Sequence, residues 1–155
     1  MPANLNRRRW EVRRDGSSWR DSASRQCQDD LDGLLNLALS FAKQMLQERP
    51  DLYPFGAAMS TDGEARLLGG DSSRDARTAR LPVLLDAIRH DRGDFRAVAI
   101  CSHVRLPDSD AVRVVLEHQE GQTVHFVVPY NSNRLRRSVE YGEPRRGTPF
   151  RQVWT

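Results

Sequence analysis

The stretch from Phe95 to Tyr130, FRAVAICSHVRLPDSDAVRVVLEHQEGQTVHFVVPY, decides the fold of this 155-residue chain. It contains three runs rich in valine and other apolar residues, which is typical of β-strands. Short polar breaks separate the runs, at residues 107–110 and at Glu120-Gly121, which we interpret as a two-residue hairpin loop. Strands joined this closely pair antiparallel. The expected strands cover residues 95–106, 111–119 and 122–130.

A helix is expected before this meander, over residues 29–49. Its apolar residues recur at the spacing of three, four and seven that defines one face of a helix. Asp29 or Asp30 can cap its start, and Pro50 ends it. The residues expected on its buried face are Leu31, Leu34, Leu35, Ala38, Ala42, Met45 and Leu46.

A hairpin and a second helix lie between the first helix and the meander. Strands are expected at 57–60 and 64–68, joined by a turn at Thr61-Asp62-Gly63. A helix that ends near His90 follows. The element order is then α-β-β-α-β-β-β. We therefore expect an α+β fold, a single domain with two helices and an antiparallel five-stranded sheet.

Charge divides the chain into three parts. The first 25 residues carry seven arginines against three acidic residues, a local charge of +4, and the last 22 residues also carry +4. Residues 26–133 carry −5, so the net charge of +3 conceals an acidic body. We interpret residues 1–26 as a basic, flexible arm and residues 27–155 as the domain, with an irregular basic C-terminal segment. A short edge strand is expected within that segment, at 138–142.

The arm mixes arginine with tryptophan, a pattern that can hold a nucleic-acid strand by charge and stacking. Like-charged blocks of this kind are also common in tails that bind nothing. The candidate nucleic-acid contacts are Arg7, Arg8, Arg9, Trp10, Arg13, Arg14 and Trp19.

Composition excludes several classes of protein. No run reaches the ~18 apolar residues that a membrane helix needs, and no apolar segment follows the basic N-terminus as in a secretory signal. Cys27 and Cys101 are the only cysteines, so a reducing, cytoplasmic compartment is expected. A single lysine against 23 arginines suggests a GC-rich bacterial genome.

Five short segments follow one another along the chain in a recognisable pattern. They are Tyr53-Pro54-Phe55-Gly56-Ala57-Ala58-Met59, Asp62-Gly63-Glu64, Arg66-Leu67-Leu68, Val114-Val115-Leu116-Glu117-His118 and Val128-Pro129-Tyr130. Together with the preceding helix they resemble a pattern in small uncharacterised bacterial proteins, where a helix ends in a Tyr-Pro-Phe segment and enters a hairpin. The likeness covers roughly residues 30–130 and implies a shared fold, with no assigned activity. Separately, the element order resembles the roadblock and profilin-like α/β architecture, a topological likeness that implies no function.

The expected strand register brings four candidate ligands to one face of the sheet. If Glu120-Gly121 is a two-residue loop, Leu116 lies opposite His125, and the preceding hairpin places Cys101 opposite Leu116. Cys101, His103, His118 and His125 then share one face across three strands. Imidazole and thiolate are ligands that zinc prefers, and they are also the parts of a cysteine nucleophile and its base. A slip of one residue in a hairpin would separate the four.

No other motif indicates catalysis. The Gly69-Gly70-Asp71-Ser72-Ser73 loop lacks the glycine pattern of a phosphate-binding loop, and no Gly-x-Ser-x-Gly elbow is present. We therefore expect a non-catalytic, cytoplasmic interaction domain without a cofactor. Its partner would be another protein, as for an immunity-type protein, or a second copy in a homodimer. The alternatives are a nucleic-acid binder that uses the arm, and a metal or thiol enzyme that uses the Cys101, His103, His118 and His125 face.

Overall fold

The computed structural model describes residues 19–69, 81–133 and 135–154. Its helical elements are η1 (Trp19–Ser22), α2 (Arg25–Glu48), α4 (Leu81–His90) and η2 (Arg92–Asp94). Its strands are β1 (Phe55–Ser60), β2 (Ala65–Gly69), β3 (Phe95–Arg105), β4 (Asp110–His118), β5 (Thr123–Asn133), β6 (Ser138–Tyr141) and β7 (Arg145–Arg146).

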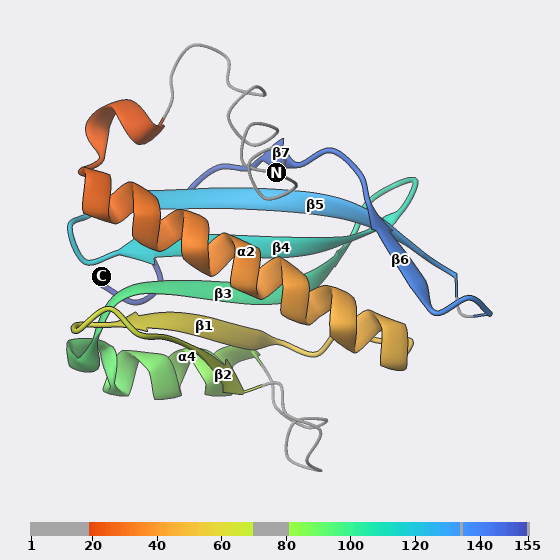
Figure 1. The fold of residues 1–155 in the computed structure, drawn as a ribbon, viewed down its shortest axis with the longest axis horizontal. Helices are drawn as coiled ribbons and strands as arrows, with labels where there is room; N and C mark the ends of the chain where they lie inside the picture. Colours follow the sequence, from red (N-terminus) through yellow and green to blue (C-terminus); the bar gives the residue numbers. More distant parts are fainter. Residues whose placement is uncertain (1–18, 70–80, 134, 155) are drawn as a thin grey trace.

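The strands form one antiparallel sheet in the order β2-β1-β3-β4-β5-β6, and β7 pairs with β5 beside this path (Figure 1). The α+β class, the two α-helices and the antiparallel sheet are confirmed. The expected number of five strands is wrong, because the described chain contributes seven. Two of them come from the basic C-terminal segment: β6 lies within the expected edge strand, and β7 was not expected. A strand of two arginines such as β7 has none of the alternation of apolar and polar residues that identifies a strand.

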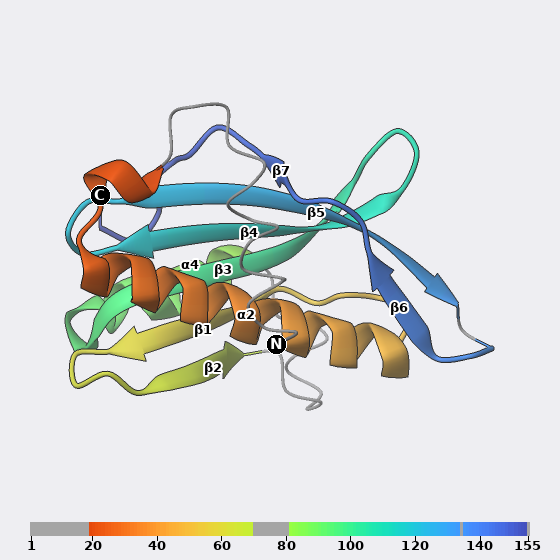
Figure 2. The same cartoon turned by 45° about the horizontal axis from the view of Figure 1, so that its top comes forward.

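Helix α2 covers one face of the sheet (Figures 1 and 2). All seven residues expected on its apolar face are buried, and they pack on alternate residues of β1, β3, β4 and β5. The helix begins earlier than expected because Ser24 is its N-cap, and the Ser24 hydroxyl accepts a hydrogen bond from the Cys27 N–H at 3.1 Å. The arm and the domain therefore do not divide at residue 26.

Residues 19–26 belong to the folded domain. Trp19 is 8% exposed and joins the core beneath α2. The Arg20 guanidinium donates two hydrogen bonds, of 2.9 and 2.6 Å, to the buried Asp32 carboxylate. The remainder of the expected arm, residues 1–18, lies outside the described residues.

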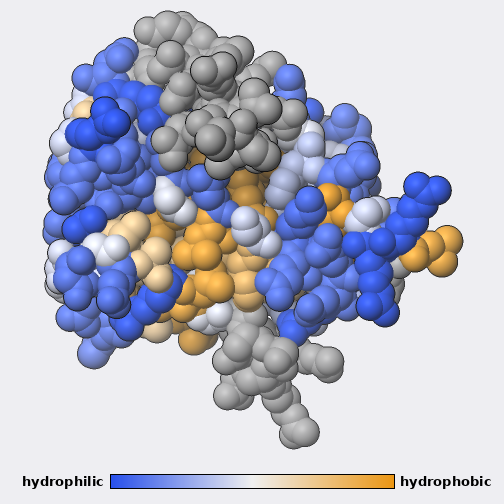
Figure 3. Space-filling view, viewed as in Figure 1, coloured by the Kyte–Doolittle hydropathy of each residue, from blue (hydrophilic) through white to orange (hydrophobic). Residues whose placement is uncertain are grey.

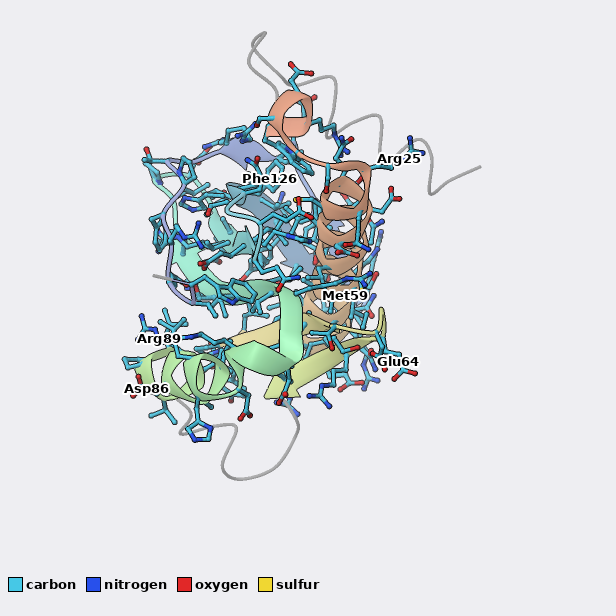
Figure 4. The ribbon with its side chains drawn as sticks, turned by 90° about the vertical axis from the view of Figure 1, so that its left-hand side faces the viewer. Arg25, Met59, Glu64, Asp86, Arg89 and Phe126 are labelled. Carbon is cyan, nitrogen blue, oxygen red and sulfur yellow. The ribbon has the colours of Figure 1, made fainter. Side chains whose placement is uncertain are left out.

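Helix α4 and the C-terminal segment both pack on the opposite face of the sheet. Helix α4 packs Leu84 and Ile88 against β1 and β3, and Figure 4 shows α2 and α4 on opposite sides of the strands. The C-terminal segment covers the neighbouring part, with Val153 fully buried. The Glu117 carboxylate, itself 2% exposed, holds this segment by accepting hydrogen bonds from three successive backbone N–H groups. These come from Gln152, Val153 and Trp154, at 2.9, 3.0 and 2.8 Å.

Candidate functional site

The observed register does not bring the four predicted ligands together. Cys101 lies opposite Val114, two residues from the expected partner, and a shift of two keeps it on the expected face. His125 lies opposite Val115, one residue from the expected partner. Because side chains alternate along a strand, this single step places His125 on the opposite face from Cys101 and His118.

The loop between β4 and β5 is the physical reason for this difference. It has three residues, Gln119, Glu120 and Gly121, closed by a hydrogen bond from His118 N–H to Gln122 O at 2.8 Å. Gly121 has φ +110° and donates its N–H to His118 O. A turn followed by a positive-φ glycine is the usual three-residue hairpin loop. The expected two-residue loop at Glu120-Gly121 is therefore wrong.

The four predicted ligands lie in separate environments. Cys101 is fully buried in the apolar core, where burial raises the pKa of its thiol. The exposed His103 ring lies with Nε2 2.8 Å from Asp110 Oδ1. The Nδ1 atom of His125 lies 2.9 Å from Thr148 O, beneath the C-terminal segment. His118 alone joins a cluster with other groups that could bind a metal.

His118 is fully buried at the end of β4, where it meets the first turns of α2. Its Nε2 atom lies 3.0 Å from Oδ2 of Asp30, and its Nδ1 atom accepts the Glu120 N–H at 3.2 Å. Asp30, 3% exposed, also receives two hydrogen bonds of 2.9 Å from the Arg96 guanidinium. A carboxylate, a guanidinium and an imidazole thus form one buried polar cluster within the apolar interface of α2 and the sheet.

Cys27 adds a thiol to this cluster. Ligand atoms of Cys27, His118 and Glu120 all lie within 4.8 Å of one another. Burial, together with the Glu120 and Asp30 carboxylates, raises the pKa of Cys27 to about 12. The thiol is also inaccessible to solvent, with an exposed fraction of 0%. A nucleophilic cysteine needs a lowered pKa and access for its substrate, so the arrangement does not support thiol catalysis in this conformation.

A second feature is an apolar groove of about 400 Å³ between β2 and α4. Val83 lies on its rim and remains 61% exposed, while Leu84 and Ile88 form its floor. Leu67 also borders the groove, but its side chain lies on the α2 face of the sheet because Leu67 pairs with Ala57. Among the described residues, Arg66 and Asp91 are the only charged ones in its lining. The groove runs beside the outer edge of β2, which has no neighbouring strand among the described residues.

The candidate nucleic-acid contacts gain no support from Trp19, because its ring is buried in the core and cannot stack on a base. The other candidates, Arg7, Arg8, Arg9, Trp10, Arg13 and Arg14, lie outside the described residues. A different basic surface lies at the end of the β5–β6 hairpin, where Leu135 is 98% exposed beside Arg136 and Arg137. Figure 3 shows mostly hydrophilic residues at this end of the molecule.

Comparison of the chain with family models, with curated proteins and with solved structures found no match. Among the described helices, none is both long and apolar enough to cross a membrane. Any assignment of function therefore depends on the geometry of the groove and of the buried cluster.

Proposed function

We propose that this domain binds an extended segment of another protein, which adds as a strand to the outer edge of β2. The observation that carries this proposal is the coincidence of an unpaired strand edge with an apolar groove at its side. Recognition by strand addition needs both features. Backbone hydrogen bonds supply affinity, and a pocket for alternate side chains supplies specificity.

The backbone of β2 is oriented for this role. Ser60 donates its N–H to Glu64 O at 2.8 Å, so these two residues form a hydrogen-bonded pair at the turn between β1 and β2. Hydrogen-bonded and non-bonded pairs alternate along an antiparallel ladder. Ala65, Leu67 and Gly69 therefore direct their backbone N–H and C=O groups away from β1, toward the free edge.

The groove favours an apolar segment without a strong net charge. Among the described residues of its lining, most are aliphatic, and the charges of Arg66 and Asp91 offset each other. Side chains alternate between the two faces of an added strand. Every second side chain of the bound segment would therefore enter the groove and cover the exposed Val83.

Selection from a displayed random-peptide library, with the full chain as bait, tests the proposal. We expect enriched peptides with apolar residues at alternate positions. Their binding should fall at least about tenfold in Val83→Asp, because a charge in a desolvated contact costs more than about 1.4 kcal/mol. Leu135→Asp is the matched control, since it places the same charge on an exposed leucine at the far hairpin.

Two results would contradict the proposal. One is a set of enriched peptides that bind the Val83→Asp variant as well as they bind the original chain. The other is a concentration-dependent dimer in sedimentation that dissociates in Leu67→Lys, which would assign the edge of β2 to a second copy of this chain.

A cytoplasmic location of the protein is part of the same proposal. Cys27 and Cys101 are both free and buried, which suits a reducing, cytoplasmic compartment. The likeness to roadblock and profilin-like domains is also retained as a proposal. It is supported by the packing of α2 and α4 on opposite faces of an antiparallel sheet.

A further inference from the structure

The cluster at the start of α2 has the composition of a metal site. A thiol, an imidazole and a carboxylate, from Cys27, His118 and Glu120, offer ligand atoms within 4.8 Å of one another. Tetrahedral zinc with bonds of 2.0–2.3 Å places its ligand atoms about 3.3–3.8 Å apart. Glu120 lies in an exposed hairpin loop. A shift of its side chain by about 1 Å would bring the three ligand atoms to the separations that tetrahedral zinc requires.

The His118 ring is already held in the orientation that a ligand requires. Asp30 lies 3.0 Å from Nε2, and its own position is fixed by two hydrogen bonds from Arg96. A carboxylate on one ring nitrogen sets the tautomer and leaves the lone pair of the other nitrogen for a metal, as in the second shell of many zinc sites. That other nitrogen is Nδ1, which accepts only a long hydrogen bond of 3.2 Å from the Glu120 N–H.

Negative charge surrounds the thiol. Asp30 is paired with Arg96, but Glu120 makes no ion pair with any basic side chain in the part of the chain that the structure describes. Its carboxylate instead accepts a hydrogen bond from Ser24 Oγ at 2.8 Å, which ties the loop to the N-cap of α2. A divalent cation would neutralise Glu120 and favour a thiolate on Cys27 at the same time.

We propose that Cys27 Sγ, His118 Nδ1 and the Glu120 carboxylate bind a zinc-class divalent ion. The donor set of one sulfur, one nitrogen and one oxygen suits zinc, whereas calcium and magnesium take oxygen ligands. Three protein ligands leave the fourth tetrahedral position for water or for a ligand atom of a partner. Asp30 is a positioning residue that acts through His118. The site lies apart from the groove beside β2 and does not depend on the proposed strand addition.

Calorimetric titration of the reduced, chelator-treated full chain with zinc chloride tests the site. We expect one equivalent to bind with a Kd below ~1 µM near pH 7, as three-ligand and four-ligand protein sites do. Binding should release about one proton, from the Cys27 thiol, which titrations in buffers of different ionisation enthalpy measure. Cys27→Ser should abolish this release and weaken binding at least about 100-fold.

Two further variants separate a metal site from a general loss of structure. Glu120→Gln changes an exposed side chain, keeps the fold, and should weaken zinc binding about tenfold or more. Asp30→Asn should weaken it about 10–100-fold through the orientation of His118. Cys101→Ser is the matched control, because that buried thiol lies outside the cluster, and it should leave the zinc affinity unchanged.

The proposal is overturned if zinc shows no saturable one-to-one binding, or if the affinity in Glu120→Gln and Cys27→Ser equals that of the original chain. Binding that is lost in Cys101→Ser but retained in Cys27→Ser would also overturn it. Because these measurements need no partner protein, they succeed or fail independently of the proposed strand addition.

Discussion

Replacement of Glu117 by glutamine should release the C-terminal segment from the sheet. The buried carboxylate accepts three backbone N–H groups, from Gln152, Val153 and Trp154, at 2.8–3.0 Å. Hydrogen bonds to a charged group contribute about 1.5–3 kcal/mol each, against about 0.5–1.5 kcal/mol for neutral pairs. Glutamine loses one acceptor oxygen and the charge. We expect Glu117→Gln to lower the free energy of unfolding by about 3 kcal/mol. The loss grows no further once the segment has detached from the sheet.

Urea and thermal unfolding measure this change. For a domain of this size, about 3 kcal/mol corresponds to a fall of about 6–12 °C in Tm. Hydrogen exchange supplies the local readout, because the amides of residues 152–154 should exchange faster in the variant. Glu140→Gln is the control: Glu140 is exposed on β6, and its replacement should change stability by less than about 0.5 kcal/mol. A Glu117→Gln protein with unchanged stability and protected C-terminal amides would refute the conclusion that Glu117 holds the C-terminal segment on the sheet.

Three other perturbations have defined outcomes. Leu35→Ala removes a side chain that is 2% exposed and should cost about 2–5 kcal/mol in urea unfolding, whereas Asn36→Ala on the exposed face should cost less than about 0.5 kcal/mol. Gly121→Ala forces an L side chain to φ +110° and should cost about 1–2 kcal/mol, measured in the same way. Raising the pH from about 9 to about 12 should lower the free energy of unfolding, because burial raises the pKa values of Cys27 and Tyr130 to about 12, so the folded chain retains protons that the unfolded chain releases. Unfolding at stepped pH should show a shallower decline in Cys27→Ala.

The two hairpin loops show where sequence reasoning succeeds and where it fails. Both place glycine third in a three-residue loop with positive φ, +94° at Gly63 and +110° at Gly121. The turn at residues 61–63 was expected with three residues and is confirmed. The loop at 120–121 was expected with two residues and has three, and this error of one residue placed His125 on the wrong face of the predicted sheet. Register depends on turn geometry, which a Glu-Gly pair alone does not determine.

The buried cluster escaped prediction for a related reason. The apolar face of α2 was identified correctly from its periodicity, but the helix was started at residue 29, with Asp29 or Asp30 as its cap. Because the helix begins after Ser24, Cys27 lies within it on the same inward face as Leu31, and Asp30 is a buried helical residue and not the cap. The partners of Asp30, Arg96 and His118, are 66 and 88 residues distant along the chain. Only the tertiary packing of α2 on β3 and β4 brings them together.

Amide hydrogen exchange of the full chain with and without a selected peptide tests strand addition most directly. Binding at the edge of β2 should slow exchange at Ala65, Leu67 and Gly69 by about tenfold or more, because their N–H groups face the free edge. Arg66 and Leu68 are internal references, since their N–H groups already face β1 and should change little. Slowed exchange confined to other elements, with Ala65, Leu67 and Gly69 unchanged, would contradict the account.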